Sequence, residues 1–151
     1  MYFHTGTFLV PPGDTSLVLF QIGTMPYLLM PLRCAQRICA LVIGVDKYCN
    51  NPPLQNAVRD ARAVGTELES TGAIIVNATN CTKSELNVKI EEYLGLLREN
   101  DVAMLFFAGH GCEYKNAFRM FAISEGEESN IDRDTVNLLT LINRSAASSP
   151  L

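Results

Sequence analysis

The sequence carries one histidine in a setting suited to proton transfer. His110 lies between Gly109 and Gly111, directly after the fully apolar run of residues 102–107. Two glycines allow the backbone to turn sharply at the end of a buried strand. In an open α/β sheet, ligands bind outside the carboxyl ends of the strands, and a histidine titrates near neutral pH. We therefore interpret His110 as a residue placed for chemistry.

Two carboxylates occur at comparable positions. Asp46 follows a second apolar run, residues 38–45, and Asp60 lies near the amino end of the helical pattern that comes next. If the two strands are neighbours, Asp46 and His110 share one crevice, where such groups can bind a cation and move protons. Simpler explanations stay open, because aspartates also form turns and favour the first turn of a helix.

The elements that must position these residues alternate between strand and helix. Strand patterns cover residues 38–45, 73–76 and 102–107, with helical patterns over residues 54–68 and 86–97 between them. Thr82 and Glu85 have capping-box spacing, and Gly72 suits the end of the first helix. This β-α-β-α-β order predicts an α/β fold with a mainly parallel sheet and helices on its faces.

The remaining segments are shorter or less regular. We expect a short strand at residues 118–123, an acidic turn at 125–134, a final helix near 136–142 and a frayed tail at 144–151. Residues 1–36 contain one acidic residue and four prolines, which predicts a poorly ordered or loosely docked extension. Its apolar run is too short and interrupted to span a membrane, and an interfacial anchor is the alternative.

Composition excludes several classes of function. The chain has 151 residues, 48% of them hydrophobic, and a net charge of −4 with scattered basic residues, which argues against binding nucleic acid. No phosphate-binding glycine loop is present. The five cysteines form no CxxC pair, so we expect no zinc and a reducing, cytoplasmic setting.

Three segments resemble the caspase-like cysteine peptidases, of the metacaspase and paracaspase type. They are ALVIGVDKY at residues 40–48, LQNAVRDA at 54–61 and FFAGHG at 106–111. They occur in the family's order and spacing, and the similarity covers residues 37–143. The resemblance implies a three-layer caspase-like sandwich, here incomplete, with residues 1–36 outside it.

The resemblance also implies a cysteine–histidine dyad. His110 takes the place of the dyad histidine, and the backbone N–H of Gly111 would contribute to the oxyanion hole. Asp60 matches an acid of the pocket that receives the residue before the cleaved bond. We predict Asp60 and Asp46 as substrate-binding residues and polypeptides with Arg or Lys at that position as substrates. We predict no cofactor: the resemblance leaves calcium as the alternative, but the acidic stretch at 125–134 does not match the calcium motif of metacaspases.

The expected nucleophile is missing. In this family the cysteine ends the next buried strand in an Asp-x-Cys setting, and this chain has no cysteine after Cys112. Cys112 lies too close to His110 along the chain for productive attack geometry. We therefore expect the amino-terminal part of a peptidase domain, inactive by itself. The alternative is a non-catalytic module that pairs with a caspase-like relative through an open edge of its three-stranded sheet.

Overall fold

The computed structural model describes residues 2–10, 18–20, 37–49, 51–98, 101–123 and 130–148. Its elements follow one another along the chain as a series of strands interrupted by four helices. In order they are β1 (Tyr2–Val10), β2 (Val18–Phe20), β3 (Ile38–Gly44), α1 (Ala57–Ser70), β4 (Ile74–Thr79), α2 (Lys83–Leu96), β5 (Val102–Tyr114), β6 (Ala117–Phe121), α3 (Ile131–Asp134), β7 (Thr135–Asn137) and α4 (Leu138–Ser148).

The predicted parallel core is confirmed. The sheet runs in the order β2-β1-β5-β3-β4, and β3 pairs in parallel with both β4 and β5. Leu41 of β3 is fully buried and stands opposite Val76 on one side and Leu105 on the other. Such runs are apolar throughout because a parallel sheet covered by helices buries both of its faces.

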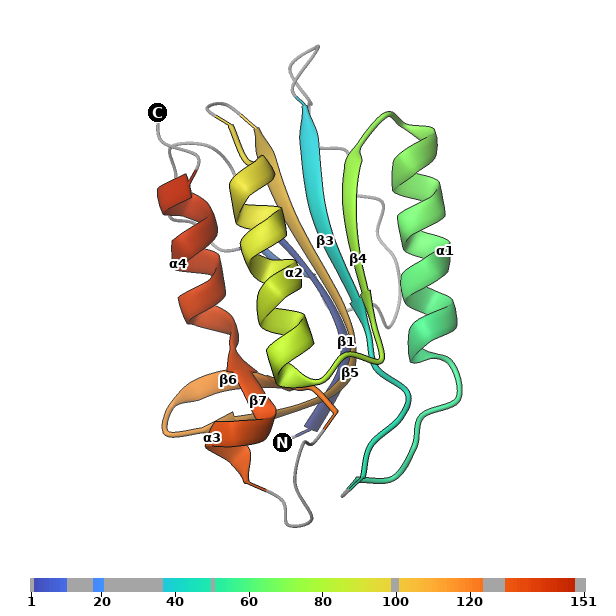
Figure 1. The fold of residues 1–151 in the computed structure, drawn as a ribbon, viewed down its shortest axis with the longest axis vertical. Helices are drawn as coiled ribbons and strands as arrows, with labels where there is room; N and C mark the ends of the chain where they lie inside the picture. The colour runs from blue at the N-terminus through green and yellow to red at the C-terminus, as the bar shows by residue number, and fades with distance from the viewer. Residues whose placement is uncertain are drawn as a thin grey trace.

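Helices cover both faces of this sheet (Figure 1). Alternate residues of β3 and β5 enter two separate cores, since side chains along a strand point to opposite faces. Ala40, Val42 and Phe106 pack with α1, whereas Leu41 and Phe107 pack with α2 and α4. The result is the three-layer α/β sandwich that the sequence predicts.

The ends of the two long helices follow the local signals. Thr82 and Glu85 form the predicted capping box at the start of α2, with both hydrogen bonds present. α1 ends at Ser70, and Gly72 adopts a φ of 85°, which glycine accepts without strain.

The predicted turn at Gly109–Gly111 is wrong. β5 continues through both glycines to Tyr114, and among the described glycines Gly72 has the positive φ. The strand continues because β6 folds back on it as an antiparallel partner, with Gly111 opposite Met120. The predicted strand at residues 118–123 is this β6.

Part of the amino-terminal extension lies in the sheet. β1 pairs antiparallel with β5 from Tyr2 opposite Cys112 to Val10 opposite Ala103. The backbone pairing with β5 makes residues 2–10 a docked segment. It also covers one edge of the parallel core, the edge of β5 that faces away from β3. The predictions for residues 11–17 and 21–36 lie outside the described residues.

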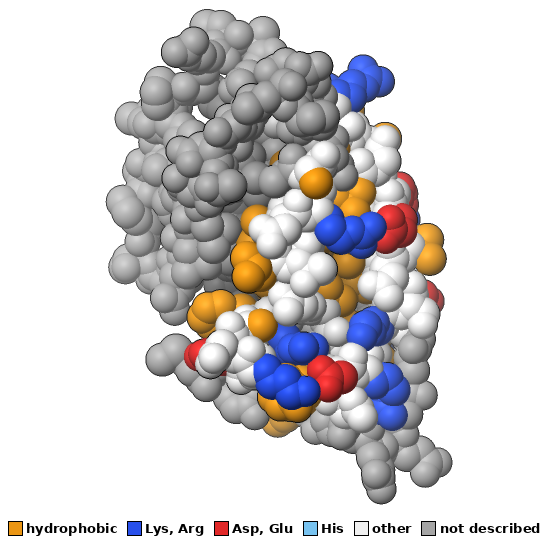
Figure 2. Space-filling view, turned by 90° about the vertical axis from the view of Figure 1, so that its left-hand side faces the viewer, with side chains coloured by type: hydrophobic (Ala, Val, Ile, Leu, Met, Phe, Trp, Pro, Cys, Tyr) orange, Lys and Arg blue, Asp and Glu red, His pale blue; other side chains and the backbone are white. Residues whose placement is uncertain are grey.

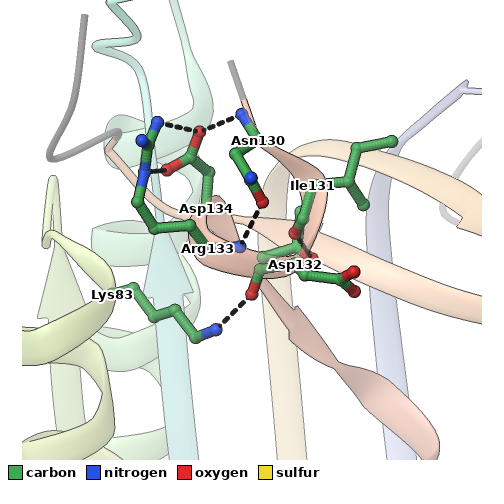
Figure 3. A network of polar contacts seen from close by, with 7 residues as sticks. Lys83, Asn130, Ile131, Asp132, Arg133 and Asp134 are labelled. Atoms are coloured by element: carbon green, nitrogen blue, oxygen red, sulfur yellow. Dashed lines mark hydrogen bonds and ion pairs between the residues drawn. The ribbon is translucent and has the colours of Figure 1, made fainter. Parts of the chain in front are cut away.

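The carboxyl-terminal segment is more regular than predicted. Residues 135–137 form β7, and α4 continues to Ser148, where we expected a frayed tail from residue 144. The helix persists because Leu141, Ile142 and Ser145 are buried, and the Ser145 hydroxyl donates to the Leu141 carbonyl. Within the predicted acidic turn, Asn130 caps the short helix α3, where Arg133 pairs with Asp134 (Figure 3).

Candidate active site

His110 lies where β5 changes partners. β5 pairs with β3 as far as Ala108 and with β6 from Gly111 onward. Because β1 occupies the other edge of β5 up to Cys112, β6 joins on the edge that β3 leaves. The His110 backbone N–H falls between these two ladders and donates instead to the Tyr48 hydroxyl, at 2.8 Å.

The opposite edge of β5 has an irregular register at the same place. Phe3 of β1 stands opposite Gly111, but Thr5 stands opposite Ala108, so Gly109 and His110 together face one β1 residue. Two residues opposite one is the arrangement of a β-bulge, which redirects side chains and often lies beside functional sites. The bulge is therefore a local reason for the special orientation of His110.

Gly109 is needed for close packing. A Cβ atom at this position would lie 2.7 Å from both the Phe107 Cζ atom and the Tyr48 hydroxyl oxygen. Both distances are shorter than a van der Waals contact allows. The first glycine of the Gly-His-Gly motif thus lets Tyr48 reach the backbone of His110, rather than allowing a turn.

The imidazole is held on the loop that leads into α1. Its Nε2 atom lies 2.8 Å from the Pro52 carbonyl oxygen, and its ring centre lies 4.7 Å from that of Tyr48. A carbonyl only accepts hydrogen bonds, so Nε2 carries the proton and the basic lone pair of the neutral ring is on Nδ1. The His110 residue is 9% exposed. Burial raises the pKa of Tyr48, so its phenol stays neutral beside the imidazole.

Asp46 follows β3 at the carboxyl end of the sheet, as predicted, and its carboxylate supports the backbone. Its Oδ1 atom accepts the Val58 N–H of α1 at 3.0 Å. The Asp46 N–H donates to Asn80 Oδ1, and the Asp46 carbonyl accepts the Leu54 N–H. Asp46 therefore fixes both ends of the loop that carries Tyr48 and Pro52.

Asp60 lies in the first turn of α1, on the helix that Asp46 anchors. Its side chain is 48% exposed, and its Oδ1 atom lies 3.7 Å from an Arg59 guanidinium nitrogen. An exposed pair at this distance contributes little to stability, so the Asp60 carboxylate is accessible to another cation.

The family model for the caspase domain of the C14 peptidases matches residues 37–148. The chain belongs to this caspase family. The match spans the three-layer core and includes His110, Asp46 and Asp60. No curated protein matches the chain.

Cys112 of this caspase domain is a poor nucleophile. It is on β5, two residues beyond His110, and half-buried. Burial raises the pKa of its thiol, and the positive charge of Arg119 offsets this only in part. At neutral pH the group is then a thiol, whereas nucleophilic attack needs a thiolate. Burial also raises the pKa of the Cys39 thiol, at the centre of the sheet, to about 11.

Three residues of the site were not singled out from the sequence. Tyr48 and Pro52 orient His110, and Asn80 accepts the N–H groups of Asp46 and Lys47. Tyr48 ends one of the family-like segments, which was a usable signal. Asn80 has a φ of 49°, a conformation that asparagine tolerates better than most residues, but one sequence does not reveal it.

Within the described residues, no cluster of three or more His, Cys, Asp or Glu side chains is arranged to hold a metal ion. The helices among these residues also include none with the length and apolar character to cross a membrane.

Proposed function

We propose that this caspase domain carries the histidine half of a cysteine–histidine dyad of the metacaspase or paracaspase type, for cleavage of polypeptides after Arg or Lys. The observation that supports it best is the doubly held His110. Its backbone is bonded to Tyr48 and its ring to the Pro52 carbonyl, so the imidazole has a defined tautomer and orientation. A fixed tautomer is what a general acid–base histidine needs.

In the proposed reaction, a thiolate attacks the scissile carbonyl carbon and forms a tetrahedral oxyanion. The protonated His110 gives its proton to the leaving amine as the carbon–nitrogen bond breaks, which leaves a thioester. Water then attacks the thioester, loses a proton to His110 and releases the acid and the thiolate, which restores the thiolate and the protonated histidine. The Gly111 N–H, beside the histidine on β5, is the proposed donor to the oxyanion.

Asp60 is the better of the two substrate-binding candidates. Its half-exposed carboxylate has one weak ion pair, whereas one Asp46 oxygen already accepts the Val58 N–H. A carboxylate on the first turn of α1 would bind the guanidinium of Arg or the ammonium of Lys before the cleaved bond. Asp46 then acts on the substrate indirectly, by holding α1.

We further propose that the chain alone does not hydrolyse peptides. The sequence has no cysteine after Cys112, and burial raises the pKa of that thiol. β1 also occupies the edge of β5 that faces away from β3. A strand bringing a nucleophile to β5 on that side would have to displace β1.

The test uses fluorogenic peptides ending in Arg or Lys, with the 151-residue chain and its His110→Ala variant. We expect no turnover above background from either protein, with or without added calcium. Asp60→Asn serves as a second variant if any activity is present. Turnover by the parent chain that disappears in His110→Ala would contradict inactivity while supporting the histidine's role.

A non-catalytic pairing module is the second candidate. Among the described strands, β4 is at the end of the sheet and has a strand partner only in β3. Its outer edge offers backbone groups to a strand of a caspase-like relative. Sedimentation of the purified chain, alone and mixed with an active relative, tests this candidate, and a chain that stays monomeric in both would contradict it.

A further inference from the structure

A second candidate site lies on the other helical layer. An open pocket of about 220 Å³ lies between α2, α4, β6 and β7. It shares no residue with the His110 site. Its lining residues come from all four elements: Lys83, Asn87, Ile90, Arg119, Thr135, Val136, Asn137, Thr140, Leu141 and Arg144.

The cavity lining is positively charged. Lys83, Arg119 and Arg144 contribute three cations, and no lining residue is acidic. Figure 2 shows Lys and Arg side chains gathered on the lower part of the face that carries α4, with acidic side chains beside some of them. The whole chain has a net charge of −4, so this local excess is opposite in sign to the protein. Such a concentration of cations favours a negatively charged ligand.

The carboxylates that balance these cations lie outside the cavity lining. Arg144 pairs with Glu91, and Arg119 pairs with Asp132, whose side chains are 62% and 58% exposed. Lys83 instead donates to the Asp132 backbone carbonyl, as Figure 3 shows. The Arg144–Glu91 pair is exposed on both sides and therefore weak, which leaves Arg144 available to a ligand, whereas the Arg119 side chain is only 16% exposed.

Arg119 gives the most specific signal. One of its terminal nitrogens contacts Asp132 and Thr135. Its buried Nε atom has no hydrogen-bond acceptor among the described residues. Buried donors are nearly always paired, and one left without an acceptor destabilises the fold. Among the described residues, the hydrogen bonding of this arginine is therefore incomplete.

Two helix amino termini adjoin the cavity. α2 begins at Lys83, and Asn137, which precedes α4, accepts the Thr140 N–H. Figure 1 shows both helices starting at the end of the molecule where β6 and β7 lie. The positive end of the α4 dipole adds to the field of the three cations, whereas the Glu85 carboxylate of the capping box lies at the start of α2.

We propose that this cavity binds the phosphate group of a small molecule. Arginine and lysine pair well with phosphate oxygens, and the Thr140 hydroxyl and the asparagine side chains around them supply further donors. The volume suits a phosphate with a short substituent, because sites for larger ligands span roughly 300–1,000 Å³.

The test is a titration of the full chain with inorganic phosphate, with sodium chloride at matched ionic strength as the comparison, followed by ³¹P NMR line width and by thermal unfolding. We expect phosphate to raise the unfolding temperature more than chloride does, as a ligand of the folded state must. Arg144→Gln and Lys83→Gln should each weaken phosphate binding about tenfold, because each removes a charge-assisted contact.

Arg62→Gln is the matched control. Arg62 is exposed on α1, in the opposite helical layer, and should leave phosphate affinity unchanged. The phosphate affinity of Arg119→Gln is compared only if this variant still unfolds cooperatively, which shows that it is folded. Equal loss of affinity in the Arg62 and Arg144 variants, or an equal response to phosphate and chloride, would overturn the proposal.

Binding to vesicles of phosphatidylcholine, with and without phosphatidic acid, shows whether the phosphate group belongs to a lipid headgroup or to a free small molecule. Sedimentation that needs both phosphatidic acid and Arg144 would support the site with a lipid headgroup as ligand. Binding of soluble phosphate alone would support it with a free ligand, and binding of neither would overturn it.

Discussion

His110 depends on a tyrosine and a proline that come from another part of the chain. The Tyr48 hydroxyl accepts the His110 N–H at a position where neither β3 nor β6 supplies an acceptor. The Pro52 carbonyl fixes the ring tautomer. At the scale of single residues, the candidate site is therefore a histidine held by one loop, and the loop's contacts can be tested without any substrate.

The first prediction concerns Tyr48→Phe. This substitution removes the acceptor of a buried backbone N–H, so we expect the free energy of unfolding to fall by about 1–3 kcal/mol. Urea denaturation measures the change. Tyr114→Phe is the control, because the Tyr114 hydroxyl interacts with the exposed Lys115, and its effect should stay within about 0.5 kcal/mol. Equal effects would contradict the role given to Tyr48.

The second prediction separates two glycines. Gly109→Ala places a methyl group 2.7 Å from Phe107 and Tyr48, and we expect a loss of about 1–3 kcal/mol in stability. Gly95→Ala in α2 meets no atom within 4 Å and should stabilise the protein by about 0.4–1 kcal/mol. Thermal unfolding of both variants checks the opposite signs. A neutral Gly109→Ala would show that Tyr48 does not approach this backbone closely.

How much the sequence predicts at the scale of residues depends on how far apart along the chain the interacting residues lie. The apolar strand before His110 and the glycines around it are local features, and the interpretation of His110 as a site residue depends on them. The function given to those glycines was wrong, because close packing against Tyr48 involves residues more than sixty positions apart. Asp46 shows the same limit, since its bond to Val58 follows from the folded loop and not from the local pattern.

At the scale of elements, an ion pair joins the starts of two adjacent strands. Arg37 precedes β3 and donates to both carboxylate oxygens of Asp101, which precedes β5. Asp101 also accepts the Arg98 N–H. Its burial opposes the charged form, but the hydrogen bonds from Arg37 and Arg98 outweigh this and lower its pKa. The pair therefore couples β3 to β5 at the end opposite the candidate site.

The third prediction follows from the sign of that shift. A carboxyl group with a lowered pKa in the folded state stabilises the protein at pH values above its unfolded pKa of about 3.9. That stability disappears as the pH falls through the lower folded value. We expect Asp101→Asn to reduce stability at pH 7 by about 1.5–3 kcal/mol and to match the parent at strongly acidic pH.

Chemical denaturation of both proteins across this pH range provides the measurement. Asp132→Asn is the comparison, because Asp132 is an exposed partner in salt bridges, and its effect at pH 7 should be small. A stability difference for Asp101→Asn that persists unchanged to low pH would contradict the proposed linkage.

Element prediction succeeded where local signals were strong and failed where pairing was long-range. The Thr82–Glu85 capping box and the apolar stripe of α2 predicted that helix well. The extension of β5 through Gly111 depends on β6, and the register irregularity at His110 depends on β1. Neither partner is visible in the local pattern of residues 102–114, so that stretch looked like a strand ending in a turn.

At the scale of the whole molecule, the parallel core is closed on one side by the amino-terminal strand. β1 follows β5 from Ala103 to Cys112, which covers the backbone groups of the strand that carries His110. A strand edge with its N–H and C=O groups exposed is a template for pairing with another chain. β1 therefore protects the caspase domain from association through this edge.

The last prediction concerns a chain without β1. A variant that lacks residues 1–20 should associate more strongly than the full chain, because the exposed β5 edge pairs between copies. Sedimentation equilibrium over a range of concentrations measures the difference. A synthetic peptide of residues 1–10 should reverse the association by pairing with β5, whereas a peptide with the same residues in scrambled order should not. If the shortened chain associates no more than the full one, β1 does not protect the edge of β5 from another strand.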